Sequence, residues 1–578
     1  MKVILVDLKE KSYSERPLID VMAGGRLLTA QLVTEFINPH VDPLSPENVL
    51  VMAAGPLAGY KVSTGGRFSI GTKSPLTGGI KEANCGGMAG DSLAALGYRG
   101  IVFLNAFPDD EPGIFILDKT SCRFESARYY WGLNNEALAE ALRTDFGDEY
   151  VQVGIGRGGE QQLRAAGIAV SDANGQPFRF AARGGVGAVM GSKRLKAVLI
   201  RRGRSLAEVN AGARSAVKAF NRFVATNPQV EELRDYGTAS TVMPVQVLGG
   251  LPTRNFSVGQ FEYAENIHGD RMRELILQRG GVGTPTEGCM DGCVIRCSNV
   301  FPDENGKLAV APLEYETLGL CGSNIGLKTL DEIARINRLC NNIGLDTIEI
   351  GAALGVLMEA VERGQDIPAQ FNPGQLPVFG DGNRAAEIVQ EISDGTELGR
   401  LVGNGVVAAG RAFRVRRIPA VKNQAMSAYD PRVIKGTGVT YATTPQGADH
   451  TAGLTVFAPV DHADPTLAVT VSKANQIQRA AYDALGLCVF NIGATGRNPE
   501  LIIEMMKNAY EVELPANWLD ILGREVIRLE LLFNRAAGLS LLDDRIPEYF
   551  AEEPVAPTQN IWNVSQMEMD HIWDDLFE

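Results

Sequence analysis

A change of hydrophobic periodicity near residue 203 restricts the fold of this chain more than any other feature. Before it, short apolar runs such as "KVILV", "NVLVMAAG" and "KAVLI" alternate with Gly, Pro and Asp turns, a pattern typical of β-strands. Beyond it, apolar residues recur at helical spacing. We therefore predict an α+β protein with a β-rich domain over residues 1–204, followed by two mainly α-helical domains over 205–415 and 416–578.

Two stretches carry the helical prediction. The segment "LDEIARINRLCNNIGLDTIEIGAALGVLMEAVERG" predicts two helices that meet at the glycine of "NNIGLD". The segment "NWLDILGREVIRLELLFNRAAG" predicts the longest helix of the chain. Residues 364–383 are rich in Pro and Gly and predict a surface excursion, and the second domain boundary is placed in "FRVRRIPA", residues 413–420.

Composition excludes several classes of protein. The 578 residues include 55 Lys and Arg against 69 Asp and Glu, a net charge of −14 that argues against binding to nucleic-acid phosphates. No run of about 18 apolar residues occurs, so we expect no membrane span. The first residues, "MKVILVDLKEKSYSE", lack the features of a signal peptide. We expect a cytoplasmic protein.

Three of the eight cysteines fall within nine residues of "EGCMDGCVIRCSN". In a straight helix, Cys289 and Cys297 would lie about 12 Å apart along the axis, too far for one compact ion. The segment must therefore turn, which Gly288 and Gly292 allow. Three converging thiolates with a fourth from elsewhere indicate an iron–sulfur cluster; tetrahedral zinc and unliganded core cysteines are the alternatives. Cys293 is the third thiol, and spacing alone does not choose the fourth.

Glycine-rich stretches suggest contacts with phosphate groups. Gly154-x-Gly156-x-x-Gly159 imitates a dinucleotide fingerprint, but no helix of sufficient length and no closing acidic residue follow it. Arg67 and Arg183 each stand beside paired glycines, in 63–79 and 181–193. Backbone N–H groups with an Arg fork suit a phosphate; tight turns with solvated arginines are the alternative.

Several motifs together resemble the aldehyde:ferredoxin oxidoreductase family of tungstopterin enzymes. They run in family order from about residue 42 to residue 554. The matching stretches are "DPLSPENVLVMAAGPLAG", "STGGRFSIGTKSPLTG", "ANCGG", "ARGGVGAVMGSKRLKA", "EYET", "GLDTI", "AYDPR", "YAT", "GLC" and "LLFNRAAGL".

The resemblance implies a set of cofactors and the residues that bind them. Two molybdopterins hold one tungsten, their phosphates share a Mg²⁺ ion, and a [4Fe–4S] cluster is bound by four cysteines. The implied cluster ligands are Cys289, Cys293, Cys297 and Cys488. The implied pterin-site residues are Arg67, Asn84, Gly86, Arg183, Gly184, Asn341, Gly344, Leu345, Asp346, Asp483, Gly486, Leu487 and Cys488. Each of the "NNIGLD" and "DALGLC" segments would hold one pterin.

Three departures from the family pattern modify these expectations. The first gap of the cysteine loop has one extra residue, which puts the loop geometry in question. Asn341 replaces the first acid of the "DxxGLD" motif. Arg335 and Arg338 occupy positions where some members carry a Glu-x-x-His pair that binds an iron between subunits. We therefore expect a hetero-oligomer and not a metal-bridged homodimer.

The resemblance assigns catalysis to Glu316, in "EYET", and His450, in "QGADHTAG". A carboxylate can act as a general base, and an imidazole can polarise a carbonyl or shuttle a proton. It implies interconversion of aldehydes and carboxylates, with electrons passed to ferredoxin or an iron–sulfur subunit. One alternative is a related low-potential reaction, such as ring reduction of an aromatic acyl-CoA. Catalytic subunits for that reaction are expected to alter the Glu316/His450 pair. The other alternative is a zinc-stabilised scaffold without catalysis.

Overall fold

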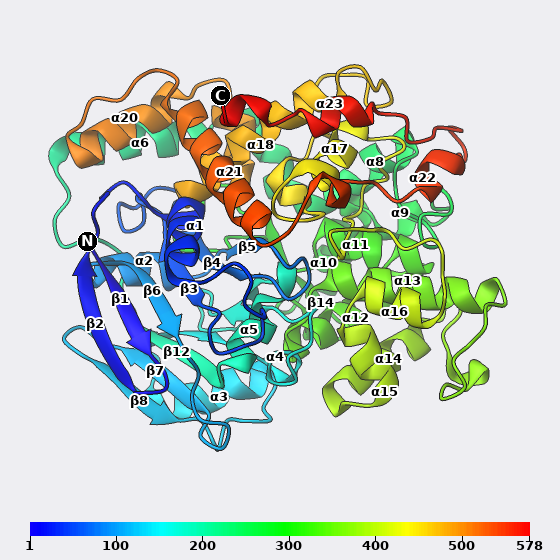
Figure 1. The fold of residues 1–578 in the computed structure, drawn as a ribbon, viewed down its shortest axis with the longest axis horizontal. Helices are drawn as coiled ribbons and strands as arrows, with labels where there is room; N and C mark the ends of the chain where they lie inside the picture. The colour runs from blue at the N-terminus through cyan, green and yellow to red at the C-terminus, as the bar shows by residue number, and fades with distance from the viewer.

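The computed structural model describes residues 1–578. Strands gather in the N-terminal part of the chain and helices in the remainder, which confirms the predicted α+β class (Figure 1). The first sheet has the strand order β2-β1-β6-β3-β4-β5 and the second has the order β11-β10-β9-β12-β7-β8. The strands of the first sheet are β1 (Lys2–Asp7), β2 (Ser12–Pro17), β3 (Leu50–Ala54), β4 (Phe68–Lys73), β5 (Ile80–Cys85) and β6 (Tyr98–Leu104). Those of the second are β7 (Gly113–Leu117), β8 (Cys122–Ser126), β9 (Tyr150–Gly154), β10 (Ile168–Val170), β11 (Arg179–Ala181) and β12 (Leu195–Arg201).

The two sheets repeat one topology. Read from β8, the second order becomes β8-β7-β12-β9-β10-β11, which matches the first strand for strand. In each sheet the second and third strands, β1 with β6 and β7 with β12, form the one parallel pair, and all other pairs are antiparallel. The helices repeat as well, with α1 (Gly25–Phe36) and α2 (Ala89–Ala95) matched by α3 (Asn135–Phe146) and α5 (Val186–Ser192). This repeat was not predicted from the sequence.

The sheets pack face to face around a shared apolar core. Alternate residues of both sheets, such as Ile4, Met52, Phe115 and Val153, enter this core together with side chains of α2 and α5. The outer face of the second sheet is covered by Leu138 and its neighbours on α3, and α1 covers the first sheet. This alternation of buried faces explains why the apolar runs of the first 200 residues have a strand period.

Helices dominate after β12. The helices of the region before residue 415 are α6 (Ala211–Ala225), α7 (Pro228–Tyr236), α8 (Val242–Leu248), α9 (Ala264–Ile267), α10 (Gly269–Arg279), α11 (Tyr315–Leu320), α12 (Leu330–Ile343), α13 (Thr347–Glu362), α14 (Gly382–Asp394), α15 (Glu397–Gly403) and α16 (Val406–Ala412). Those of the C-terminal region are α17 (Lys435–Thr443), α18 (Ala468–Ala484), α19 (Ile492–Thr495), α20 (Glu500–Tyr510), α21 (Trp518–Ala536), α22 (Tyr549–Glu552) and α23 (Gln566–Asp570). No helix is long and apolar enough to cross a membrane.

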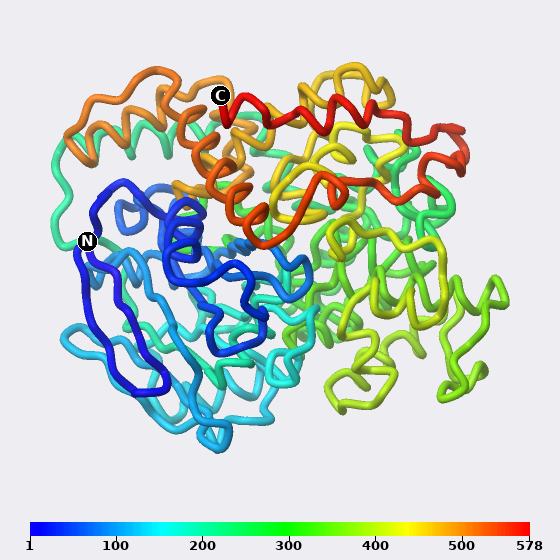
Figure 2. The backbone as a smooth tube through the Cα atoms, viewed as in Figure 1, coloured from blue at the N-terminus to red at the C-terminus, as the bar shows by residue number.

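The specific helical predictions are confirmed. α12 and α13 meet at Gly344, and the 19-residue α21 is the longest helix. Residues 364–383 form a largely exposed excursion that projects from the helical part at the right of Figure 2. The boundary proposed at 204 falls between β12 and α6, and that at 415 falls between α16 and the two-residue strand β16 (Ala420–Val421). Both boundaries remain predictions.

Two helix ends meet the repeated sheets at equivalent points. The residue before β4, Arg67, donates its backbone N–H to the carbonyl of Gly486 (3.2 Å), and the residue before β10, Gly167, donates to Gly344 (3.0 Å). Both Gly344 (φ 83°) and Gly486 (φ 66°) have a left-handed backbone. In each motif the leucine after the glycine donates its backbone N–H to the carbonyl of the residue five positions before that leucine. The repeated "GL" of the two motifs therefore ends two helices in the same way.

Candidate active site

The cysteine loop lies in a hairpin, as the need for a turn predicts. It connects β13 (Thr284–Glu287) to its antiparallel partner β14 (Ser298–Pro302). The backbone of Gly292 is left-handed (φ 72°), as a turn at a glycine requires. Gly288 does not have a positive φ. Gly86 has a further reason to lack a side chain, because a Cβ there would lie 2.9 Å from the Cys289 sulfur.

Hydrogen bonds bring the distant Cys488 to this loop. Its backbone N–H donates to Thr64 (3.0 Å), while the neighbouring Ser63 accepts from the N–H of Val294 in the loop (3.0 Å). The thiols also shift the pKa values of one another. The hydrogen bond from Cys293 is the largest cause lowering the pKa of Cys289 to about 6. Burial raises the pKa of Cys297, and the charges of Cys488 and Cys289 add to that rise.

The thiols do not form a site for a single metal ion. No group of three His, Cys, Asp or Glu side chains is arranged to hold one metal ion, whereas four sulfurs around a tetrahedral zinc would lie about 3.8 Å apart. Cys85 is a fifth thiol in the neighbourhood, and its pKa rises to about 12, chiefly through burial. Its side chain packs within the core between the sheets.

One group of expected pterin-site residues surrounds Asn84. Arg67 donates to the Asn84 side chain and to its carbonyl (3.1 Å). The Asn84 amide donates to Glu82 (3.3 Å) and to Asp483 (3.2 Å). Asp483 also pairs with Arg26 (3.4 Å), which forms a bidentate pair with a second buried carboxylate. Burial raises the pKa of Glu82 to about 7, with a further contribution from the charge of Asp483.

A second group surrounds Arg183. Its guanidinium contacts Asp346 (3.2 Å), the Ser427 hydroxyl (3.4 Å) and the carbonyls of Ala425 and Ala448 (both 2.6 Å). All its donor nitrogens have protein acceptors, so Arg183 could bind a phosphate only by exchanging one of them. Gly184 is left-handed (φ 79°), and a Cβ there would meet the side chain of Lys81 at 2.4 Å.

Glu316 and His450, predicted as the catalytic pair, lie in contact. The distance from Glu316 Oε1 to His450 Nε2 is 3.3 Å, and both side chains are less than one-fifth exposed. The other carboxylate oxygen accepts from the N–H of Ala428 (2.8 Å), which fixes the orientation of Glu316 at the start of α11. His450 Nδ1 lies 2.9 Å from the Ser427 hydroxyl.

Burial shifts both groups toward their neutral forms. It raises the pKa of Glu316 to about 8 and lowers that of His450 to about 3. At neutral pH, a protonated Glu316 faces a neutral imidazole. In the tautomer whose Nδ1–H donates to Ser427, Nε2 carries a lone pair 3.3 Å from Glu316 Oε1, so a proton can pass along this contact.

Several partners of the site were not found from the sequence. Ser427 precedes the matched "AYDPR" motif and Asp449 precedes His450, so both adjoin recognised motifs. Asp449 pairs with the fully buried Lys81, and the charges of Lys81 and Arg183 lower its pKa despite its burial. No pattern in the sequence pointed to Lys81.

One expected pterin residue is turned away from these groups. The Asn341 amide donates to the Ala311 carbonyl at 3.5 Å, while its own backbone carbonyl accepts from Asn135. Leu345 and Leu487 are buried core residues, and Asp346 caps the N-terminus of α13.

Buried polar atoms without protein partners test whether the site suits a polar cofactor. Such atoms occur on residues in and around the two groups: Ser69, Glu82, Arg179, Glu316, Gln424, Gln446 and Arg479. Native proteins satisfy nearly all buried polar groups, so this set fits a large polar ligand. The accompanying cations, the buried Arg26, Lys81, Arg183 and Arg479 and the half-buried Arg67, fit a ligand that carries phosphates.

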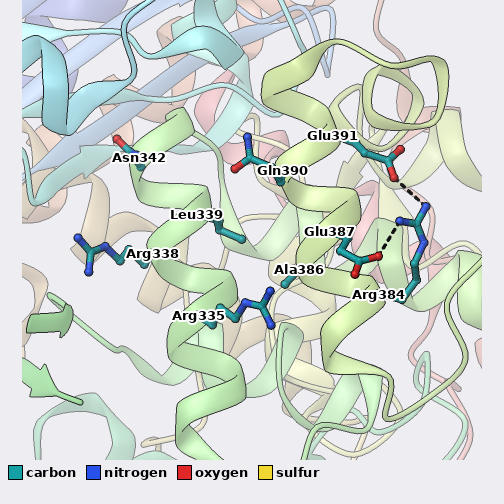
Figure 3. Close-up of a pocket in the computed structure, with 9 residues that line it drawn as sticks. All are labelled: Arg335, Arg338, Leu339, Asn342, Arg384, Ala386, Glu387, Gln390 and Glu391. Carbon is teal, nitrogen blue, oxygen red and sulfur yellow. Dashed lines mark hydrogen bonds and ion pairs between the residues drawn. The ribbon is translucent and has the colours of Figure 1, made fainter. Parts of the chain in front are cut away.

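A groove between α12 and α14 lies apart from this site (Figure 3). It contains Arg335 and Arg338, where part of the resembled family carries iron ligands. Arg335 donates to Asn383 (2.8 Å), and Arg338 pairs with Glu136 (3.1 Å). Arg384 lines the same groove and pairs with two glutamates of α14. The groove offers no reason to expect a bound cation.

Comparisons with known proteins find the same family over nearly the whole length of the chain. Residues 3–202 match the N-terminal domain of aldehyde ferredoxin oxidoreductase, and residues 215–578 match its domains 2 and 3. The tungsten-containing aldehyde ferredoxin oxidoreductase of Pyrococcus horikoshii is 30% identical over 98% of this chain and 94% of its own. That of Pyrococcus furiosus is 31% identical, covering 96% of this chain and 91% of its own.

Two further similar proteins carry names other than aldehyde ferredoxin oxidoreductase. The WOR-like subunit of an aliphatic sulfonate oxidoreductase from P. furiosus is 25% identical over 96% of this chain and 90% of its own. The active site complex BamBC of benzoyl coenzyme A reductase has a similar fold, with a TM-score of 0.79 at 17% identity over 100% of this chain and 93% of its own. The chain is an oxidoreductase and belongs to the aldehyde ferredoxin oxidoreductase family.

Proposed function

We propose that this chain is a tungstopterin- and [4Fe–4S]-dependent enzyme that interconverts aldehydes and carboxylates. The observation that carries the proposal is the buried contact between Glu316 and His450. It places a proton acceptor and a proton donor side by side, beside buried polar groups without protein partners. Oxidation of an aldehyde to a carboxylate adds a water-derived oxygen and releases two electrons and three protons, so the reaction needs such a pair.

The residues around Asn84 and Arg183 would hold the two pterins. Arg67 and Asn84 would bind one pterin, and Arg183 with Gly184 would bind near the shared Mg²⁺ and phosphates. The family's cofactor supplies two-electron chemistry when bound. Gly344 and Gly486, which accept from Gly167 and Arg67, stand at equivalent places relative to the repeated sheets, as two similar ligands would require.

The protein residues then have distinct roles in the reaction. Ionised Glu316 takes a proton from the attacking water, while the Ala428 N–H holds the carboxylate in position. His450 accepts that proton through Nε2 and can then pass it to the substrate oxygen, and Ser427 fixes the ring. Burial of the pair excludes bulk water from the reacting groups.

The cysteines would bind the cluster next to the pterin-site residues. Cys488 follows Gly486, whose carbonyl accepts from Arg67, so the proposed cluster and pterin sites share one short segment. A [4Fe–4S] cluster bound by these cysteines would supply one-electron transfer to ferredoxin or an iron–sulfur subunit. We expect a hetero-oligomer, because the positions of the bridging iron ligands carry arginines.

The partner would dock beside the cysteine loop. The segment 201–222 carries six cations and one anion in a chain of net charge −14. Within it, Asn221 of α6 donates to the Lys61 carbonyl (3.0 Å) and accepts from Ser63 (2.7 Å), which itself contacts the loop. The exposed Lys218 and Arg222 of α6 thus lie near the loop and suit an acidic partner.

Anaerobic purification with metal analysis tests the proposal, followed by a panel of aldehydes with a viologen as electron acceptor. We expect tungsten, about four iron atoms per chain, and dye reduction with at least one aldehyde. A colourless protein that contains zinc alone would contradict it. Turnover of an aromatic acyl-CoA without any aldehyde activity would favour the ring-reduction alternative.

A further inference from the structure

Arg179 lies between the two ends of the cysteine loop. It begins β11, and its side chain is only 5% exposed. One terminal nitrogen donates to the Ser298 hydroxyl (2.7 Å), and the other lies 3.5 Å from a Glu287 carboxylate oxygen. Ser298 follows Cys297, and Glu287 stands two residues before Cys289.

Two nitrogens of the Arg179 guanidinium have no hydrogen-bond acceptor. Neither Nε nor Nη2 makes a hydrogen bond, although both atoms are buried. Leaving a buried donor unpaired destabilises the folded state, and more so when the donor belongs to a charged group. Glu287 does not remove this cost, because its oxygen lies beyond hydrogen-bonding distance and its side chain is 23% exposed. The position therefore requires another acceptor.

The contacts of Arg179 place its guanidinium next to two of the proposed cluster ligands, because Ser298 adjoins Cys297 and Glu287 lies two residues before Cys289. Arg67, the other guanidinium near the thiols, already donates to Asn84. Arg179 thus has unpaired donors among residues that surround the proposed cluster.

We propose that Arg179 donates its free N–H groups to the sulfur atoms of the iron–sulfur cluster and raises the cluster's reduction potential. The inference rests on the proposed function for the presence of that cluster. One-electron reduction adds a negative charge to a buried site, and a fixed cation with N–H donors stabilises the reduced form more than the oxidised form. Arg179 acts through the cluster and is a positioning residue.

Redox titration of the full-length enzyme, followed by electron paramagnetic resonance, tests the inference. Mediated dithionite supplies the single electron. Arg179→Gln is expected to lower the midpoint potential of the cluster at unchanged iron content, and Arg179→Lys to lower it less. Arg204→Gln is the matched control. Arg204 pairs with Asp291 of the same loop at 3.5 Å but is 64% exposed, so solvent screens its charge and the potential should not move.

A second variant keeps the test decisive if Arg179→Gln loses iron. Glu287→Gln removes the carboxylate that partly neutralises Arg179, so the midpoint potential is expected to rise. An unchanged potential in both Arg179→Gln and Glu287→Gln, with full iron content, would overturn the role of Arg179 while leaving the proposed function intact. A wild-type enzyme without iron would overturn both.

Discussion

Replacing Glu316 by glutamine isolates proton transfer from every other property of the site. Glutamine has the same shape and keeps an oxygen that can accept from the Ala428 N–H, 2.8 Å away in the wild type. It cannot accept a proton from water. Because burial raises the pKa of Glu316 to about 8, the wild-type side chain is mostly neutral at pH 7, and the substitution changes little charge. We expect the fold and the metal content to be retained.

The magnitude follows from the pKa. A carboxyl group of pKa about 8 is ionised in about one-tenth of molecules at pH 7 and in about nine-tenths at pH 9. If ionised Glu316 is the base, wild-type kcat for aldehyde oxidation rises about ninefold between these pH values. Glu316→Gln should lower kcat by about 10²-fold or more, or about 2.7 kcal/mol in the barrier, and should lose this rise.

The assay is viologen reduction with a saturating aldehyde from pH 6 to pH 9, with tungsten and iron measured in each preparation. Glu349→Gln is the matched control. Glu349 is a buried carboxyl group that accepts from the backbone N–H groups of Ala425 and Val406, both at 2.9 Å. The Glu349→Gln variant should keep the wild-type dependence of kcat on pH. Wild-type turnover and the same rise with pH in Glu316→Gln would refute the general-base role.

Further outcomes test the remaining parts of the proposal. His450→Ala should lower kcat by about 10²-fold at unchanged metal content, because the proton taken by Glu316 loses its acceptor; unaltered turnover would remove His450 from the mechanism. Cys488→Ala should lose the iron of the cluster in metal analysis, whereas Cys122→Ala, in a strand far along the chain from the loop, should keep it. Reversing the charges of Lys218 and Arg222 to Glu should slow electron transfer to an acidic ferredoxin but leave the viologen rate unchanged; equal slowing of both would contradict docking at α6. The isolated chain should not reduce NAD, since Gly154–Gly159 lacks the context of a dinucleotide site; efficient NAD reduction without an added iron–sulfur protein would refute the proposed electron path.

Local patterns determined much of the fold in advance. The strand period of "KVILV" and "KAVLI" and the helical period around "NNIGLD" reflect which side chains face a core, and the structure confirms these elements. The cysteine spacing required a turn, because a helix would separate the first and last thiols by about 12 Å. The hairpin of β13 and β14 supplies that turn. The family assignment followed from motifs spread over the chain, and the comparisons confirm it.

The repeat of the two sheets was invisible in the sequence. Corresponding strands carry different residues, because a buried strand needs only apolar side chains of suitable volume and not particular ones. Short strands such as β10 and β11 also carry too few residues to show a period. The matching hydrogen bonds of Arg67 and Gly167 to two helix ends became evident only when both sheets were placed together.

The chemistry of the site depends on tertiary structure for a similar reason. Glu316 and His450 are 134 positions apart in the chain, and their 3.3 Å contact and opposite pKa shifts arise from shared burial. The same holds for Lys81 with Asp449 and for Arg179 beside the cysteine loop. A sequence specifies which groups can ionise or donate. Only the folded chain decides which of them lose water, and desolvation sets both their pKa values and their need for a partner.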